Sequence, residues 1–240
     1  MAETSQFNLP LLSSSQAQKS VTVNEALSVL DAVAQLRIVS SILLAPPTDA
    51  LDGDAFLVPL GATGDWFGES GNLAIHCNGG WRFVTPKVGW HAFNIETGTN
   101  QLFDGTAWLD STMAATPSGT ATEYEIVEID HVLGAGTSSS TVPLIPQNAQ
   151  VVGVTGRVIQ EITGSLTSWK LGIDDDEPAP QRFGHGLGLA LNSYVLGMSG
   201  TPTTYYSSTP LLLSAEGGDF ASGTVRLAVH FTTLVPPRAV

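Results

Sequence analysis

One stretch of the chain has the spacing of apolar residues that is typical of an amphipathic helix. In residues 13–37, where there is little Gly or Pro, Val23, Leu27, Leu30 and Ala34 recur at spacings of four, three and four. Residues spaced in this way share one face of a helix. We therefore predict a helix here. Its apolar face packs either on its own domain or, as a short coiled-coil seam, on a second copy.

Residues 53–110 follow a different pattern, in which short apolar runs alternate with turn residues. The apolar runs are residues 55–58, 71–76, 81–84, 90–93 and 101–103. The separators include Asn78-Gly79-Gly80, Pro86, Gly98 and Asp104-Gly105. Short runs between hairpin-forming turns predict a small antiparallel β-domain.

Four of the five tryptophans lie in this same stretch, at Trp66, Trp81, Trp90 and Trp108. We expect these indoles to fill the core of a thin sheet. The alternative is that they are exposed and serve as stacking platforms for sugar rings.

The pattern changes again after Asp110. Residues 111–122 are mostly Thr, Ser, Ala, Gly and Pro without periodicity, which indicates a linker. Beyond it, apolar and polar residues alternate with a period of two, most clearly in Val225-Leu227-Val229-Phe231 against Arg226-Ala228-His230. Several such strands with no helical stretch between them predict a β-sandwich.

We therefore predict a mainly β protein with one short N-terminal helix. Its expected parts are an N-terminal segment with the helix (1–45), a small Trp-rich β-domain (46–110), a linker (111–122) and a jelly-roll-like C-terminal β-sandwich (123–240).

The net charge of the chain limits the kinds of molecule that it can be expected to bind. Nine basic and twenty-two acidic residues give a formal net charge of −13, and the 42% of hydrophobic residues is enough for a packed core. Disorder caused by excess charge is therefore excluded. No basic stripe can form, so we expect no nucleic-acid partner, because phosphate neutralisation dominates that affinity. Anionic membrane surfaces are disfavoured for the same reason.

Cysteine use and the N-terminal sequence bear on stability and location. Cys77 is the single cysteine, so an intrachain disulfide is excluded and a buried thiol is expected.

The first residues lack the pattern of a secretion signal, and no apolar run approaches the ~18 residues of a membrane span. We expect no membrane insertion and a cytoplasmic location until the chain is released.

The motifs of common enzymes are missing from the sequence. It contains no Gly-x-Ser-x-Gly elbow, His-Glu-x-x-His, Walker loop or paired-cysteine metal site, so we expect no enzyme activity, cofactor or metal. Residues 174–177 are four consecutive carboxylates, for which we predict a solvated turn, with Ca²⁺ binding as the alternative. Scattered carboxylates leave a glycosidase as the alternative activity, and they include Glu125, Glu128, Asp130 and Asp219.

Motifs in the first 110 residues carry a family resemblance. They include Glu3-Thr4-Ser5-Gln6-Phe7-Asn8-Leu9-Pro10, Asn24-Glu25-Ala26-Leu27, Gly61-Ala62-Thr63-Gly64, Gly79-Gly80-Trp81 and Asp104-Gly105 with Trp108. In this order they resemble the uncharacterised phage-associated family DUF2793, whose domains are similar to parts of tail fibres and spikes.

The second half of the chain has a resemblance of its own. Motifs such as Val154-Thr155-Gly156-Arg157-Val158-Ile159, Arg182-Phe183-Gly184 and Gly223-Thr224-Val225-Arg226-Leu227 look like a distal β-sandwich of phage fibres. The whole arrangement is most similar to head-spike fibres of alphaproteobacterial gene transfer agents. The resemblance implies a particle released from the cell and bound to the recipient's capsular polysaccharide. Residues 1–45 would join a spike base or capsid protein.

A glycan site needs rings that cover the C–H face of a sugar and short polar groups that bond its hydroxyls. The predicted C-terminal domain offers both kinds close together in sequence. The candidate residues are Trp169, Asp175, Arg182, His185, Asn192, Tyr194, Tyr205 and Tyr206. Because consecutive residues of a strand point to opposite faces, only one of Tyr205 and Tyr206 is expected to face a ligand.

Single contacts of this kind are weak, so an attachment protein gains avidity from several copies, by ~10²–10⁴-fold. We therefore expect a homo-oligomer. The fibre resemblance favours a trimer, and mounting at a capsid vertex would favour a pentamer. A capsule-degrading glycosidase and a purely structural capsid or tail decoration are the alternative functions.

Overall fold

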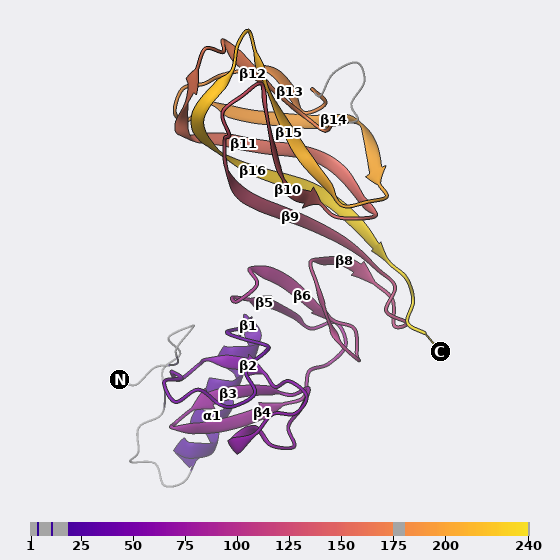
Figure 1. The fold of residues 1–240 in the computed structure, drawn as a ribbon. Coiled ribbons are helices and arrows are strands. Elements are labelled where there is room, and N and C mark those ends of the chain that lie inside the picture. Colours follow the sequence, from indigo (N-terminus) through magenta and orange to yellow (C-terminus); the bar gives the residue numbers. More distant parts are fainter. Residues whose placement is uncertain (1–3, 5–10, 12–18, 175–180, 240) are drawn as a thin grey trace. The chain divides into compact units, whose positions relative to one another are not determined.

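The computed structural model of the protein describes residues 4, 11, 19–174 and 181–239 (Figure 1). The chain forms two compact units. The first consists of residues 1–120 and 237–240, and the second of residues 121–236. The chain therefore leaves the first unit, builds the whole second unit and returns to the first. Strands dominate both units and the described residues contain one α-helix, as the sequence predicts.

The first unit is built on a seven-stranded sheet in the order β4-β3-β2-β1-β5-β6-β7. Its elements are α1 (Lys19–Ala34), β1 (Arg37–Ile38), β2 (Ala55–Leu57), η1 (Gly64–Trp66), β3 (Leu73–Cys77), β4 (Gly80–Val84), β5 (His91–Asn94), β6 (Thr99–Phe103), β7 (Trp108–Asp110) and β8 (Thr112–Ala115). The hairpins are antiparallel as predicted. Strand β1 is parallel to both of its neighbours, β2 and β5, and so joins the two halves of the sheet.

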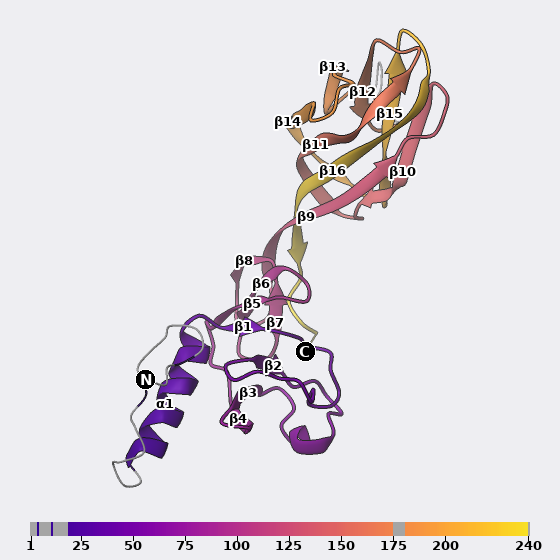
Figure 2. The same ribbon diagram turned by 90° about the vertical axis from the view of Figure 1, so that its left-hand side faces the viewer.

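The helix forms within the predicted range but packs through a different face. Its residues in contact with the core on the sheet are Val29, Ala32 and Val33. The predicted apolar face does not pack on its own domain, because Val23 and Leu30 are 41% and 54% exposed. Packing of this face on a second copy stays a prediction. The helix has two apolar stripes, and spacing alone does not say which of them meets the sheet. Figure 2 shows α1 alongside the sheet.

The opposite face of the sheet holds an aromatic cluster. Trp66 is completely buried, and its ring centroid lies 5.5 Å from that of Phe56 and 5.2 Å from that of Trp81. Trp90 and Trp108 pack against the core on the helix side. The tryptophans therefore fill cores on both faces of the sheet, as expected.

The second unit is a β-sandwich. Its strands are β9 (Ala121–Val132), β10 (Ser138–Ile145), β11 (Ala149–Gly164), β12 (Ser168–Gly172), β13 (Gly184–Leu187), β14 (Tyr194–Tyr205), β15 (Thr209–Glu216) and β16 (Phe220–Val235). One sheet has the order β10-β15-β12-β13 and the other contains β14-β11-β16-β9. Between them lies one core to which both sheets contribute, with Val154 and Leu227 from one and Leu171 and Leu213 from the other.

The period-two alternation of β16 holds in the structure. Val225, Leu227, Val229 and Phe231 are almost completely buried, whereas Arg226 is exposed on the opposite face. This alternation makes the sheet β14-β11-β16-β9 one-sided, with a core face and an outer face.

The residues around the unit boundary are more ordered than a linker. Within 111–122, residues 112–115 form β8, and the Thr116 amide donates to the Thr120 carbonyl at 2.9 Å. The C-terminal end belongs to the first unit, where the Arg238 amide donates to the Ser118 carbonyl at 2.9 Å. The Arg238 guanidinium also pairs with Asp104, whose side chain is 2% exposed.

Candidate functional site

Two of the predicted site residues lie in the sandwich core. Trp169 is 1% exposed and its indole N–H donates to the Gly188 carbonyl at 3.0 Å. Tyr205 is 7% exposed. Both occupy inward positions of their strands, so neither ring is available to a sugar, and the structure removes them from the candidate site. Tyr206 is 79% exposed, so the two tyrosines do point to opposite sides.

Two other predicted residues lie apart from the site described below. Arg182 and His185 are exposed, and a guanidinium nitrogen of Arg182 donates to the Thr203 hydroxyl at 3.1 Å. Asp175 lies outside the described residues, as does most of the predicted carboxylate turn at 174–177. Of the described candidates, only Tyr194 lines a depression on the outer face of the sheet β14-β11-β16-β9.

Tyr194 and Asn192 are the predicted residues that the structure brings together. Tyr194 begins β14 and is 68% exposed on the outer face of its sheet. Asn192, in the turn just before, has a φ of +70°. Its carbonyl accepts a hydrogen bond from the Arg157 guanidinium at 3.1 Å. The turn therefore holds this guanidinium beside the tyrosine.

Strand register extends this pair into a row across four strands. Arg157 on β11 lies opposite Tyr194 on β14 and opposite Arg226 on β16, and Arg226 lies opposite Asp130 on β9. The adjacent row runs through Glu128, Ala228, Thr155 and Leu196. Cross-strand neighbours lie close enough for their side chains to interact.

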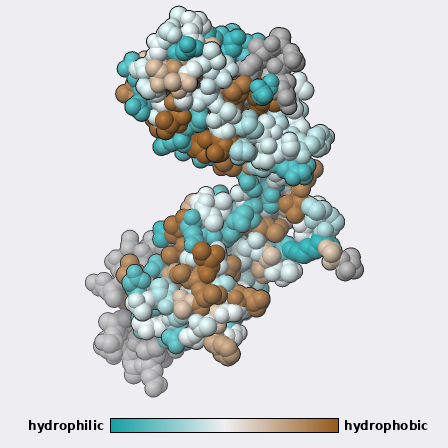
Figure 3. Space-filling view, viewed as in Figure 1, coloured by the Kyte–Doolittle hydropathy of each residue, from teal (hydrophilic) through white to brown (hydrophobic). Residues whose placement is uncertain are grey.

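A depression of about 440 Å³ opens over these two rows. Its lining residues include Tyr194, Arg157, Arg226, Glu128 and Thr155. Leu196, 70% exposed, borders it on β14. Figure 3 shows apolar residues scattered among hydrophilic ones on the face of each unit that it draws.

The two arginines of the depression differ in their partners. Arg226 donates two hydrogen bonds to the Asp130 carboxylate, at 2.7 and 2.8 Å, and lies 3.6 Å from Glu128. The hydrogen bond from Arg226 holds the pKa of Asp130 below its usual value. Within the described part of the chain, no carboxylate lies within ion-pair distance of Arg157. Its remaining N–H groups are available to a ligand.

This arrangement can bind a polar ring. The tyrosine ring offers an apolar face, and Arg157, Glu128 and Thr155 offer donors and acceptors next to it. The predicted glycan site did not include these three residues, although Glu128 was named among the carboxylates of the alternative glycosidase. Period-two alternation marks Arg157 and Arg226 as outward-facing, but only the register shows that they lie beside Tyr194.

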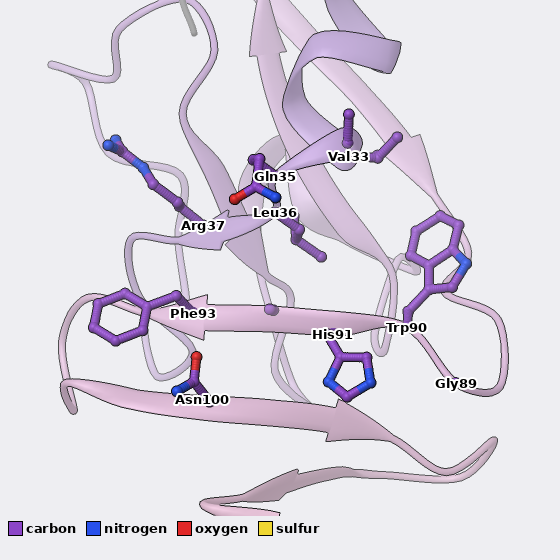
Figure 4. Close-up of a pocket in the computed structure, with 11 residues that line it drawn as sticks. Val33, Gln35, Leu36, Arg37, Gly89, Trp90, His91, Phe93 and Asn100 are labelled. Atoms are coloured by element: carbon purple, nitrogen blue, oxygen red, sulfur yellow. The ribbon is translucent and has the colours of Figure 1, made fainter.

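The first unit has a separate cavity of about 540 Å³ near the end of α1 (Figure 4). It is lined by Val33, Ala34, Gln35, Leu36, Arg37, Gly89, Trp90, His91, Ala92, Phe93 and Asn100. In Figure 4, Arg37, Phe93 and Asn100 lie in a column over β1, β5 and β6, with Trp90 and Val33 towards the other end. Trp90, expected in a core, thus also borders this cavity.

Neither unit presents a recognisable metal centre in its described residues, where no group of three or more His, Cys, Asp or Glu could hold an ion. Two histidines of the described residues lie within hydrogen-bond distance of side-chain hydroxyl groups. His131 is 2.9 Å from the Ser139 hydroxyl, and His230 is 2.9 Å from that of Thr155. No helix in the described ranges is long and apolar enough to span a membrane.

Comparison with known families supports part of the resemblance seen in the sequence. Residues 23–109 match the model of the family described as "Protein of unknown function (DUF2793)". This match covers most of the first unit and confirms the resemblance there. A comparison with curated proteins finds no match.

Two solved structures that resemble part of the chain are described as phage capsids. The "Cyanophage Pam1 capsid asymmetric unit" is 17% identical over 47% of this chain and 86% of that chain, with a TM-score of 0.35. The "Acidic stable capsid structure of Helicobacter pylori bacteriophage KHP30" is 15% identical over 49% and 98%, with a TM-score of 0.32. Similarity at this level does not identify a function.

Proposed function

We propose that this chain is a non-enzymatic component of a phage-like particle, and that its second unit binds a cell-surface polysaccharide. The observation that carries the proposal is the exposed Tyr194 ring beside the Arg157 guanidinium, at the edge of the depression on the outer sheet face. The ring covers the C–H face of one sugar, and the polar groups around it bond the hydroxyls.

The surroundings of the depression favour a polymer over a small ligand. All the described residues that line the depression belong to strands of one sheet, so a chain can pass over it. Arg226 and Asp130 are already hydrogen-bonded to each other. When a glycan binds, few charged groups of the depression therefore lose water without having a partner. The floor of the site is therefore polar, as a glycan with many hydroxyls requires.

The proposal that the chain is a component of a phage-like particle rests on the sequence. The ordered motifs of the first 110 residues, and the family match at 23–109, support a part similar to those of phage fibres and spikes. In the narrower form of the proposal, the chain is a head spike of a gene transfer agent that promotes adsorption. Residues 1–45 would join the spike base, and the particle would leave the cytoplasm in which it was assembled.

Avidity requires more than one copy of the site. One exposed ring gives a weak contact, whereas linked copies turn later contacts into intramolecular ones. We propose a homotrimer, with a pentamer as the alternative. Light scattering on the purified chain measures the number of subunits, and a strictly monomeric chain would remove the avidity argument.

Substitutions in the purified full-length chain test the glycan site. Tyr194→Ala should lower the affinity for the capsular polysaccharide by about tenfold, equivalent to ~1.4 kcal/mol, whereas Tyr194→Phe should retain most of it. The matched control is Tyr206→Ala, at a tyrosine that is 79% exposed but lies outside the depression. Equal effects of Tyr194→Ala and Tyr206→Ala would refute the site.

The same material tests the absence of enzyme activity. Purified polysaccharide is incubated with the wild-type chain and its length is followed by size-exclusion chromatography. We expect an unchanged length distribution. A distribution that shortens with time would replace the binding function by that of a depolymerase.

A further inference from the structure

We propose that the cavity of the first unit is a second saccharide site, separate from that of the second unit, and that the sugar it binds bears a carboxylate. It goes beyond the proposed function, because it concerns another unit and assigns a ligand charge. Its starting point is the row of register partners Arg37, Phe93 and Asn100 on β1, β5 and β6.

The row places an aromatic ring between two polar groups. Phe93 is 41% exposed and is absent from both apolar cores of its unit. Its register partners are Arg37 on one side and Asn100 on the other, and Figure 4 labels all three on neighbouring strands. A pyranose ring that lies on Phe93 would therefore have hydrogen-bonding groups at both of its edges.

We infer the charge of the ligand from the lack of a carboxylate partner for Arg37 among the described residues. Among the described residues, Arg82, Arg226 and Arg238 each pair with a carboxylate. Within the same described residues, Arg37 and Arg157 have none within ion-pair distance. In a chain of net charge −13, carboxylates are plentiful, so an arginine left without one beside a cavity is available to an anion.

The two unpaired arginines share one arrangement. Arg157 is the register partner of exposed Tyr194, and Arg37 is the register partner of exposed Phe93. Both pairs border cavities of similar size, about 440 and 540 Å³. A guanidinium beside an exposed ring fits a uronic acid, whose carboxylate binds the arginine while its ring lies on the aromatic face.

The end of α1 does not take part in holding the sugar. Arg37 and Phe93 alternate along their strands with Ile38 and Ala92, which belong to the core under α1. The Arg37 and Phe93 side chains therefore point to the sheet face away from α1, and the sugar lies on that face. The Gln35 amide, also in the lining, can bond a hydroxyl or the carboxylate.

Titrations of the full-length chain with D-glucuronate and with D-glucose test the proposal, followed by NMR. The Tyr194→Ala variant is used as the background, so that the site of the second unit contributes less to binding. We expect glucuronate to shift the resonances of Phe93, Asn100 and Gln35, and to bind about tenfold more tightly than glucose. Equal affinities of the two sugars, or shifts confined to other residues, would overturn the proposal.

Variants of the lining distinguish charge from stacking. Arg37→Gln should reduce the affinity for glucuronate to that for glucose, and Phe93→Ala should weaken the binding of both sugars. The matched controls are Lys87→Gln and Phe67→Ala, exposed residues of the first unit outside the lining. If Arg37→Gln binds glucuronate like the wild type, the proposal fails. The comparison of the two sugars on the Tyr194→Ala chain decides the question even if a lining variant does not fold.

These measurements distinguish a failure of the first-unit site from a failure of the polysaccharide site in the second unit. Loss of polysaccharide binding in Tyr194→Ala, with glucuronate binding unaffected by Arg37→Gln, would keep the first proposal and remove this one. Sugar binding that follows Arg37 but not Tyr194 would do the reverse.

Discussion

Arg157 and Arg226 lie directly opposite each other on the adjacent strands β11 and β16. Like charges at such positions repel each other. The pair is tolerated because Asp130 holds Arg226 through two hydrogen bonds, at 2.7 and 2.8 Å, on the side away from Arg157. Asp130 thereby offsets one charge and leaves the other available at the depression.

Replacing Asp130 by Asn should expose this repulsion. We expect Asp130→Asn to lower the melting temperature of the chain, more at low salt than at high salt, because salt screens the repulsion between exposed guanidinium groups. The measurement is thermal unfolding at two ionic strengths. Asp219→Asn, at a carboxylate for which the structure shows no arginine partner among its described residues, is the control. An equal loss in both variants would contradict the explanation.

The same aspartate should contribute to acid sensitivity. Because its pKa is lowered in the folded state, its stabilising effect is complete above the usual aspartate pKa of about 3.9 and is lost as the pH falls through the folded value. We expect the wild-type chain to lose stability more steeply than Asp130→Asn below pH 4. Parallel curves for the two proteins would show that the ion pair has no part in this loss.

Removal of the Arg238 side chain should destabilise the first unit. Its guanidinium pairs with the buried Asp104 carboxylate, which also accepts hydrogen bonds from the Thr106 and Ala107 amides at 2.9 Å. Burial alone would raise the pKa of Asp104, but these hydrogen bonds and Arg238 together lower it. We expect Arg238→Ala to cost about 1–3 kcal/mol, since a buried charged group loses a partner. Denaturant unfolding of the variant measures the loss, and Arg238→Lys should restore part of it.

His131 should make the second unit sensitive to mild acid. Burial lowers the pKa of His131, so the unfolded chain binds a proton more readily than the folded one. The free energy of unfolding therefore falls as the pH drops below the unfolded value of about 6.5. We expect His131→Gln to show a smaller dependence between pH 7 and pH 5 in denaturant titrations. If the pH dependence of the unfolding free energy is unchanged in His131→Gln, other groups must cause it.

Cys77 should react slowly with alkylating reagents. It is 6% exposed, and burial raises the pKa of its thiol in spite of the nearby Arg82. The thiolate is the reactive form, so little of it is present at neutral pH. We expect iodoacetamide to modify Cys77 only after unfolding, as followed by mass spectrometry. Rapid modification of the folded chain would mean that β3 opens easily.

The fold was more predictable from sequence than the site. Alternation in β16 identified which residues face the core, and the turns at Asn78-Gly79 and Asp104-Gly105 separated the hairpins. The helix was located from its apolar spacing, but its packing face was not, because Val23 and Val29 lie on stripes of similar apolarity. A two-residue strand such as β1 is too short to show any alternation.

The candidate sites required the register of the strands. Sequence proximity grouped Trp169 and Tyr205 with Tyr194, yet the first two are buried and only the third borders the depression. Arg157 lies far from Arg226 in sequence, and Arg37 far from Phe93, so no local pattern joins them. Pairing between distant strands brings together residues that a reading along the chain keeps apart.

The return of the chain to the first unit affects how fragments should be designed. A fragment that ends at Thr120 would contain every strand of the seven-stranded sheet but would lack the last residues of the chain. Asp104 would then remain buried in it without its cation. A faithful fragment of the first unit needs a short connection from Thr120 to Pro237 in place of the sandwich, and a simple truncation would misrepresent its stability.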